Sequence, residues 1–209
     1  LDRVNLKYMK TNIESIEKAI GALKNNHFEP ILVQTKEEAL EKVKELIPDG
    51  ASIMNGSSET LAQIGLIDHL KSGSHAWKNL HDPILAEQDP VKQGQLRREA
   101  VLSDYYIGSV HAVTENGEMM IASNSGSQIP HLTFTSPNLV LVVGANKIVP
   151  SLADAFMRIE EQVIPLEDER MKKVYGYGTL WAKTLILNKE NPAIGRKVYV
   201  LIVKEDLGF

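Results

Sequence analysis

The sequence contains no cysteine. It therefore forms no disulfide, and it offers no thiol nucleophile and no thiolate ligand for structural zinc or an iron–sulfur cluster. The absence of cysteine agrees with a cytoplasmic protein. No apolar run approaches the roughly 20 residues that a membrane span needs, and the charged, amphipathic first 20 residues lack the apolar core of a signal peptide. We therefore expect a cytoplasmic protein that does not enter the membrane.

The sequence also lacks a large excess of positively or negatively charged residues. Lysine and arginine total 23 and aspartate and glutamate 27, which gives a net charge of −4. Because a nucleic-acid binder needs a basic surface, we expect no nucleic-acid partner. With 209 residues, 43% of them hydrophobic, the chain can bury a core without disulfides. We expect one domain over residues 1–209, with the N-terminal helix either inside it or as an appendage.

Helical and strand-like patterns alternate along the chain, and a continuous apolar run suits a central parallel strand that is buried on both faces. This alternation predicts an α/β fold with a mostly parallel sheet flanked by helices. Thr35 and Glu38 form a capping-box pattern at one helix start. The helices are expected over residues 5–24, 35–46, 61–70, 90–102 and 150–163, and the strands over 31–33, 51–54, 110–115, 119–122, 139–143, 180–187 and 197–203.

A loop of small polar residues follows the strand over 51–54 and precedes a helical pattern. Free backbone N–H groups and the positive end of a helix dipole together bind anions. A serine-capped helix after a glycine turn is the alternative interpretation. The candidate ligand-binding residues of this loop are Asn55, Gly56, Ser57, Ser58, Glu59 and Thr60.

Lys147 lies just past the end of the apolar run 139–144, where ligands collect in parallel sheets. It is the candidate cation for an anionic ligand. The helix that follows has an apolar stripe that includes Ala155 and Phe156, and we expect Pro165 to interrupt it.

Asn116-Gly117 lies between two strand-like segments and is the strongest short-range signal for a two-residue hairpin with a type I′ turn. In such a hairpin Glu115 lies opposite Glu118. Carboxylates and small residues at strand ends are where α/β proteins place their chemistry. The catalytic candidates are therefore Glu115 and Asp104, and Asn124 and Gly126 beyond the hairpin are further ligand-binding candidates.

His75, His81 and Asp82 form a grouping of metal-ligating residue types. The two histidines are six positions apart, which matches no established ligand spacing, so we expect a surface connection and no metal.

Three segments in this order and spacing resemble the lactate-utilisation (LUD) domain family. They are Asn55–Thr60 followed by Ile64-Gly65-Leu66, then Ser103–Gly126, and then the strand 139–144 leading to Leu152-Ala153-Asp154-Ala155. The resemblance implies the fold shared by glucosamine-6-phosphate deaminase, ribose-5-phosphate isomerase and the CoA transferases. Proteins of that group bind phosphorylated or CoA-linked substrates at a strand-to-helix loop, the place that residues 55–60 would occupy.

The chain also departs from those relatives. Ribose-phosphate isomerases carry a paired-acid run and a lysine-glycine run, whereas residues 104–107 keep one acid and residues 124–126 lack the lysine. The class I CoA transferases carry Ser-Glu-Asn-Gly with a nucleophilic glutamate, and residues 114–117 differ from it only by threonine in the first place. The resemblance therefore leaves open a CoA-transferase-like or phosphate-ester enzyme that uses Glu115.

The resemblance also implies lactate utilisation. Oxidation of lactate to pyruvate removes two electrons, which a cofactor must accept. The sequence has neither cysteine nor a G-x-G-x-x-G fingerprint. We therefore expect a non-redox component that works with iron–sulfur oxidoreductase subunits and has no covalently bound cofactor. Its ligand would be a small anion, a phosphorylated metabolite or CoA, and a homodimer is compatible with the sequence.

Overall fold

The computed structural model describes residues 13–209. Residues 5–12 of the expected N-terminal helix lie outside this range. The helices are α2 (Ile13–Asn25), α3 (Lys36–Leu46), α4 (Glu59–Gln63), α5 (Leu66–Ser72), α6 (His81–Ala86), α7 (Pro90–Glu99), α8 (Leu152–Arg158) and α9 (Ile164–Tyr175), with a π-helical turn η4 (Ile159–Val163) between the last two. The strands are β1 (Glu29–Val33), β2 (Ser52–Asn55), β3 (Lys78–Asn79), β4 (Tyr105–Gly108), β5 (Ala112–Thr114), β6 (Met119–Ser123), β7 (Asn138–Gly144), β8 (Ile148–Val149), β9 (Lys183–Leu187) and β10 (Lys197–Val203).

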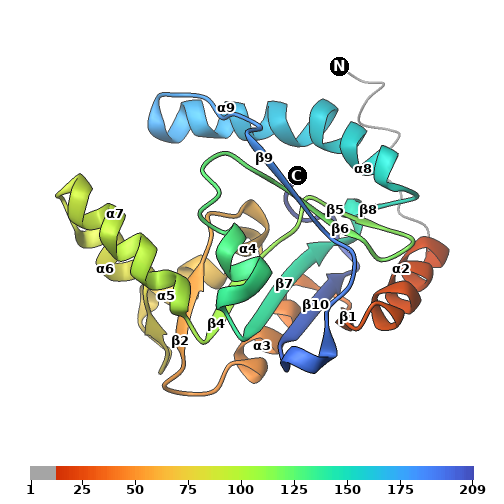
Figure 1. Ribbon diagram of the computed structural model, residues 1–209, viewed down its shortest axis with the longest axis horizontal. Coiled ribbons are helices and arrows are strands. Elements are labelled where there is room, and N and C mark those ends of the chain that lie inside the picture. The colour runs from red at the N-terminus through yellow and green to blue at the C-terminus, as the bar shows by residue number, and fades with distance from the viewer. Residues whose placement is uncertain (1–12) are drawn as a thin grey trace.

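Six strands form a central sheet in the order β1-β10-β7-β4-β2-β3, and every neighbouring pair is parallel. The expected apolar run is β7, which lies between β10 and β4 and is buried from Leu139 to Gly144 (Figure 1). The prediction of a mostly parallel sheet is confirmed. Because parallel strands share one direction, their carboxyl ends lie along one edge of the sheet.

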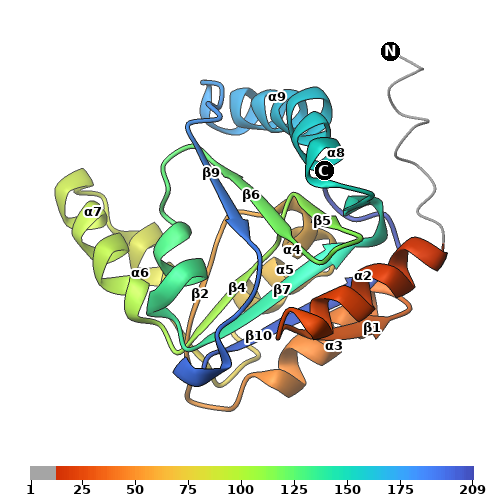
Figure 2. The same ribbon diagram turned by 45° about the vertical axis from the view of Figure 1, so that its right-hand side comes forward.

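Different elements cover the two faces of the central sheet. Helices α3, α4 and α5 pack on one face through apolar residues such as Val43, Leu61 and Leu66. Helix α2 and the β5–β6 hairpin pack on the other, with Leu23 and Met119 in the same cluster (Figure 2). At least the described part of the N-terminal helix is thus integrated into the core. No helix within residues 13–209 combines the length and the apolar character that a membrane crossing requires.

A second sheet, in the order β8-β5-β6-β9, was not expected from the sequence. Strand β6 is buried along its whole length because it is covered twice. Met119 and Ile121 face the central sheet, whereas Met120 and Ala122 face α8 and η4.

The hairpin differs from the expected two-residue turn. Gly117 has a φ of +84°, but Asn116 does not have a positive φ, so the turn is not type I′. The backbone N–H of Gly117 donates to the Thr114 carbonyl at 2.9 Å, and that of Thr114 donates to the Glu118 carbonyl at 2.9 Å. A three-residue loop with glycine in the left-handed position explains both bonds. Thr114, and not Glu115, therefore lies opposite Glu118.

The segment after β2 follows the prediction in part. Thr35 caps α3 as expected, and Ser58 caps α4 by accepting a bond from the Leu61 N–H at 3.3 Å. The single expected helix over 61–70 is two short helices, because Gly65 adopts a φ of +82° between them. The expected surface connection over 72–89 contains β3 and α6, and it buries Trp77.

The helix after β8 continues further than expected. It runs from α8 through the π-helical turn η4 into α9 without a break at Pro165. The π-helical turn places Pro165 in the first turn of α9, where an N–H has no intrahelical partner and proline is tolerated. The buried face of α8 also differs, because Phe156 is exposed whereas Arg158 is buried with Ala155 and Ile159.

Candidate functional site

Three polar side chains converge where neighbouring strands of the central sheet end. Asn55 is the last residue of β2, Ser109 follows β4, and Lys147 follows β7 by three residues. The sheet orders these strands as β7-β4-β2, so their carboxyl ends adjoin one another. Thr60 reaches the same place from the first turn of α4. This edge is where ligands bind in open parallel sheets.

The centre of this cluster is the ammonium group of Lys147. Its Nζ donates to Thr60 Oγ1 at 2.8 Å and to Ser109 Oγ at 3.1 Å. Lys147 is only 3% exposed and Thr60 only 1%. Lysine is almost never buried without a charged partner, yet both side chains to which Nζ donates are neutral hydroxyls. The site holds an amine in a place where its charge is costly.

The electrostatics of the cluster follow from this burial. Burial and the nearby charge of Arg158 lower the pKa of Lys147 to about 7. Among the carboxylates that the structure describes, none acts on Lys147 to oppose this shift. Arg158 is fully buried, and its Nε donates to the Asn146 carbonyl at 3.2 Å. Two cationic side chains thus share one interior region, which attracts anions.

His111 lies close enough to these cations to respond to them. Burial, Lys147 and Arg158 together lower its pKa to about 3. Its Nδ1 accepts the Ala122 N–H at 3.1 Å, so the neutral ring carries its proton on Nε2. The ring is therefore a neutral donor near the cluster and does not add a third positive charge.

A C-terminal segment, residues 205–209, covers the Lys147 cluster. Gly208 donates to Gln63 Oε1 at 2.8 Å, and the Asn146 side chain accepts the Leu207 N–H at 3.1 Å and donates to the Gly208 carbonyl at 3.2 Å. A Cβ added to Gly208 would lie 2.3 Å from Thr60 Oγ1 and 3.2 Å from Lys147 Nζ. Glycine is thus required for this close backbone approach.

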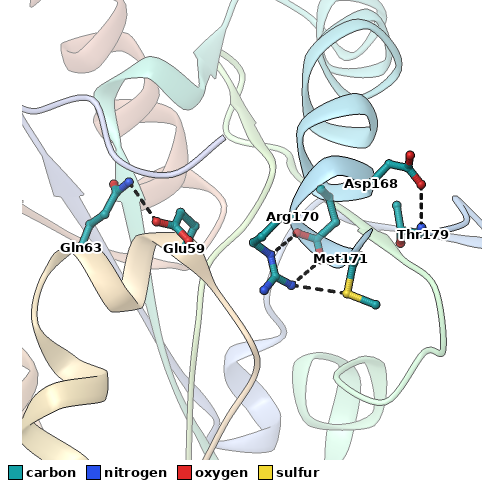
Figure 3. A network of polar contacts seen from close by, with 7 residues as sticks. Glu59, Gln63, Asp168, Arg170, Met171 and Thr179 are labelled. Atoms are coloured by element: carbon teal, nitrogen blue, oxygen red, sulfur yellow. Dashed lines mark hydrogen bonds and ion pairs between the residues drawn. The ribbon is translucent and has the colours of Figure 1, made fainter. Parts of the chain in front are cut away.

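A surface cleft lies beside this segment, between α4 and α9. It has a volume of about 750 Å³. Figure 3 shows Glu59 and Gln63 of α4 on one side and Arg170 of α9 on the other. Arg170 makes two bonds of 2.7 Å to Glu167, and this pair together with the charge of Glu59 raises its pKa. The lining residues are Glu59, Gln63, Leu166, Glu169, Arg170, Lys172, Lys173 and Phe209.

The predicted loop over 55–60 lies between the cluster and the cleft. Thr60 binds Lys147, Glu59 lines the cleft, and Ser57 is exposed. Asn55 is 2% exposed, and its Oδ1 has no hydrogen-bond partner within the described residues. Ser58 is engaged as the cap of α4, while Gly56 lies against Tyr106, whose hydroxyl would be 2.7 Å from an added Cβ.

Glu115 lies against α2. Its carboxylate accepts a bond from Ser15 Oγ at 2.6 Å and pairs with Lys18 Nζ at 3.4 Å. The Ser15 bond is the main reason why its pKa is lowered, and Lys18 adds to it. The structure thus gives Glu115 contacts that join the hairpin to α2, and its nucleophilic role stays a prediction.

Asp104 lies at the opposite end of β4 from Ser109. It accepts bonds from the Ser52 N–H at 2.9 Å and from Ser52 Oγ at 2.6 Å, and these lower its pKa. It therefore links the starts of β4 and β2. The structure does not bring Asp104 into the Lys147 cluster.

Asn124 and Gly126 follow β6 on the surface. The Asn124 carbonyl accepts a bond from Lys183 Nζ at 3.0 Å, and the Gly126 N–H donates to Ser123 Oγ at 2.9 Å. Gly126 has a φ of +86°, so it supplies a left-handed turn. These contacts belong to the β6–β9 side of the second sheet, and a role in ligand binding stays a prediction.

Three residues in or near the cluster were not expected from the sequence: Ser109, His111 and Arg158. The signal for Arg158 was its spacing of three from Ala155, which places both on one face of a helix. Ser109 follows a strand end just as Lys147 does. Within residues 13–209, no group of three or more histidine, aspartate or glutamate side chains is placed to hold a metal ion.

No curated protein sequence matches the chain. Among solved structures it is similar to a DUF162 family protein from Deinococcus radiodurans, with a TM-score of 0.57 and 11% identity over 93% of this chain and 99% of that one. It is also similar to eIF2B beta from Chaetomium thermophilum, with a TM-score of 0.40 and 13% identity over 68% of this chain and 49% of that one. For ribose 5-phosphate isomerase A from Neisseria gonorrhoeae the TM-score is 0.35 and the identity 15%, over 75% of each chain.

The first of these structures extends over almost the whole chain and supports the fold. The family model of the LUD domain matches residues 16–190, which is most of the sequence. The expected family is therefore confirmed: the chain belongs to the LUD domain family, which is associated with lactate utilisation.

Proposed function

We propose that this protein is a non-redox component of lactate utilisation that binds a small organic or phosphorylated anion at the Lys147 cluster. The observation that carries the proposal is the burial of Lys147, hydrogen-bonded to Thr60 and Ser109, at the carboxyl edge of the central sheet. A bound anion would offset the charge of a cation whose hydrogen-bond partners within residues 13–209 are hydroxyls.

The neighbouring groups suit a carboxylate or a phosphate. Arg158 adds the charge of a second buried cation, which favours either anion. Asn55 brings a buried amide to the end of the adjacent strand. The Gly56–Thr60 loop and the first turn of α4 would contribute backbone donors to a phosphorylated metabolite or to the phosphates of CoA.

The non-redox part of the proposal rests on the composition. A chain without cysteine cannot ligate an iron–sulfur cluster by thiolates. If lactate is oxidised where this protein acts, the two electrons must reach cofactors on partner subunits. The partners that we propose are iron–sulfur oxidoreductase subunits.

A thermal-unfolding screen with phosphate, lactate, pyruvate and CoA tests the binding proposal. An anion that binds only the folded state raises the melting temperature. We expect such a rise for the wild type and for Lys71→Met, which removes an exposed lysine on α5. Lys147→Met should lose it. Equal rises in all three proteins would place the binding elsewhere.

Co-purification from the native source tests the partnership separately. The tagged protein should retain iron–sulfur subunits in constant proportion under reducing conditions. Lactate oxidation by the retained complex should fall when this protein is depleted and recover when it is added back. A protein that purifies alone, and whose depletion leaves lactate oxidation unchanged, would contradict the proposed role.

A further inference from the structure

The Lys147 cluster contains the groups that a lysine nucleophile needs. An amine attacks a carbonyl only in its neutral form, and burial or a neighbouring cation provides that form. Lys147 has both, because it is 3% exposed and lies near the charge of Arg158. Its lowered pKa, about 7, leaves a large fraction of the amine neutral at physiological pH.

Two hydroxyls hold the amine in place. Thr60 Oγ1 and Ser109 Oγ lie 2.8 and 3.1 Å from Nζ. Ser109 Oγ also lies 3.4 Å from Thr60 Oγ1, so the two hydroxyls and the amine form a connected group. Such a group can pass a proton to and from an oxygen on the attacked carbon.

We propose that Lys147 forms a Schiff base with a 2-oxo acid, whose carboxylate is held by the charge of Arg158. This inference rests on the proposed function, because it names the ligand class of the same site. Oxidation of a 2-hydroxy acid such as lactate gives a 2-oxo acid, which carries a ketone beside its carboxylate. The amine of Lys147 would react with the ketone, and the nearby positive charge of Arg158 would attract the carboxylate.

The step balances without an oxidant. The Nζ lone pair forms a bond to the ketone carbon, and the carbonyl π electrons move to the oxygen. A proton moves from nitrogen to that oxygen through the Thr60 and Ser109 hydroxyls, which gives a carbinolamine. The hydroxyl then leaves as water with one further proton, and a C=N bond forms. No electrons are gained or lost overall.

Access to Nζ requires displacement of the C-terminal segment. Gly208 lies directly over Lys147 and Thr60, and three hydrogen bonds from Gln63 and Asn146 hold residues 207 and 208 there. The cleft between α4 and α9 is lined by Phe209 of this segment and by Gln63, which accepts the hydrogen bond from Gly208. It is therefore the solvent side from which a small acid would reach the amine.

Reductive trapping with pyruvate tests the proposal. The full chain is incubated with pyruvate and cyanoborohydride, and the adduct is measured by intact mass and located by peptide mapping. We expect one adduct per chain at Lys147. Lactate, which has the same carbon skeleton but no ketone, should give none. Lys147→Arg, which keeps the charge, should lose the adduct, whereas Lys71→Arg should keep it.

Mapping on the wild type locates the adduct even if Lys147→Arg folds poorly. An adduct on exposed lysines alone would overturn the Schiff base. So would the absence of any adduct while calorimetry still shows pyruvate binding that depends on Lys147, and in that case the proposed function stands. If neither pyruvate, lactate nor phosphate binds, the proposed function fails as well.

Discussion

Replacing Lys147 by methionine should remove a large pH dependence of folding stability. In the unfolded chain this lysine holds its proton up to a pH near its ordinary pKa of 10.5, whereas in the folded chain it does so only up to about 7. Between these two pH values the unfolded state binds more protons than the folded state. Raising the pH therefore favours the folded state. Below about pH 7 both states are protonated and the full cost of the buried charge is present.

The magnitude follows from the width of that interval. Each pH unit within it adds about 1.4 kcal/mol to the free energy of unfolding. Over the whole interval, from about 7 to 10.5, the gain is about 5 kcal/mol. Lys147→Met also removes the hydrogen bonds from Nζ to the Thr60 and Ser109 hydroxyls, which costs about 1–3 kcal/mol at every pH. Only the pH-dependent part reports on the titration of Lys147.

Urea unfolding of the wild type and of Lys147→Met at several pH values measures this difference, because all other titrating groups are common to both proteins. The wild type should gain stability relative to the variant by about 1 kcal/mol or more per unit above about pH 7, and the two curves should run parallel below it. Curves that run parallel throughout would refute a buried, titrating Lys147.

Three further substitutions test other parts of the structure. Gly117→Ala should destabilise the protein more than Gly176→Ala, because both have a positive φ but only at Gly117 would the added Cβ meet a backbone atom, at 2.8 Å. The left-handed strain that both variants share costs about 1–2 kcal/mol. Equal losses in the free energy of unfolding, measured by chemical denaturation, would contradict the hairpin packing. Gln63→Ala should speed reductive trapping by pyruvate, since it removes one bond to the segment that covers Lys147; an unchanged rate would show that the segment does not limit access. Glu115→Gln should lower the free energy of unfolding by less than about 1 kcal/mol. The loss should be smaller still at acidic pH, because a carboxyl with a lowered pKa stops stabilising the folded state as the pH falls through its folded-state pKa. A loss of anion binding in this last variant would instead place Glu115 in the site.

The central sheet could be predicted because its signals are local and agree with one another. The apolar run of β7 is typical of a strand that is buried on both faces, and the capping residues Thr35 and Ser58 mark helix starts directly. The family resemblance pointed to the same fold. Each of these features depends on neighbours in the sequence.

The hairpin turn could not be predicted, because tertiary contacts decide it. Asn116-Gly117 suits both a type I′ turn and a longer loop with glycine in the left-handed position. The structure selects the second, and the loop packs against α2, where the Asn26 side chain donates to the Asn116 carbonyl at 2.9 Å. The same packing directs Glu115 to Ser15 and Lys18.

The site could be predicted only in part. Lys147 and Thr60 were found because each lies next to the end of a strand or the start of a helix. Arg158 was missed because its burial depends on how α8 packs on the second sheet, which the sequence did not reveal. The continuous helix through Pro165 was missed because the sequence did not reveal the π-helical turn that precedes it.

Calorimetric titration of the protein with pyruvate, lactate and phosphate tests the central claim most directly. The account predicts saturable binding of at least one of them at one site per chain. Lys147→Met should weaken that binding by about tenfold or more, since it removes a charge-assisted hydrogen bond, whereas Lys71→Met should leave it unchanged. Binding that is equally strong in the wild type and both variants would contradict an anion site at Lys147.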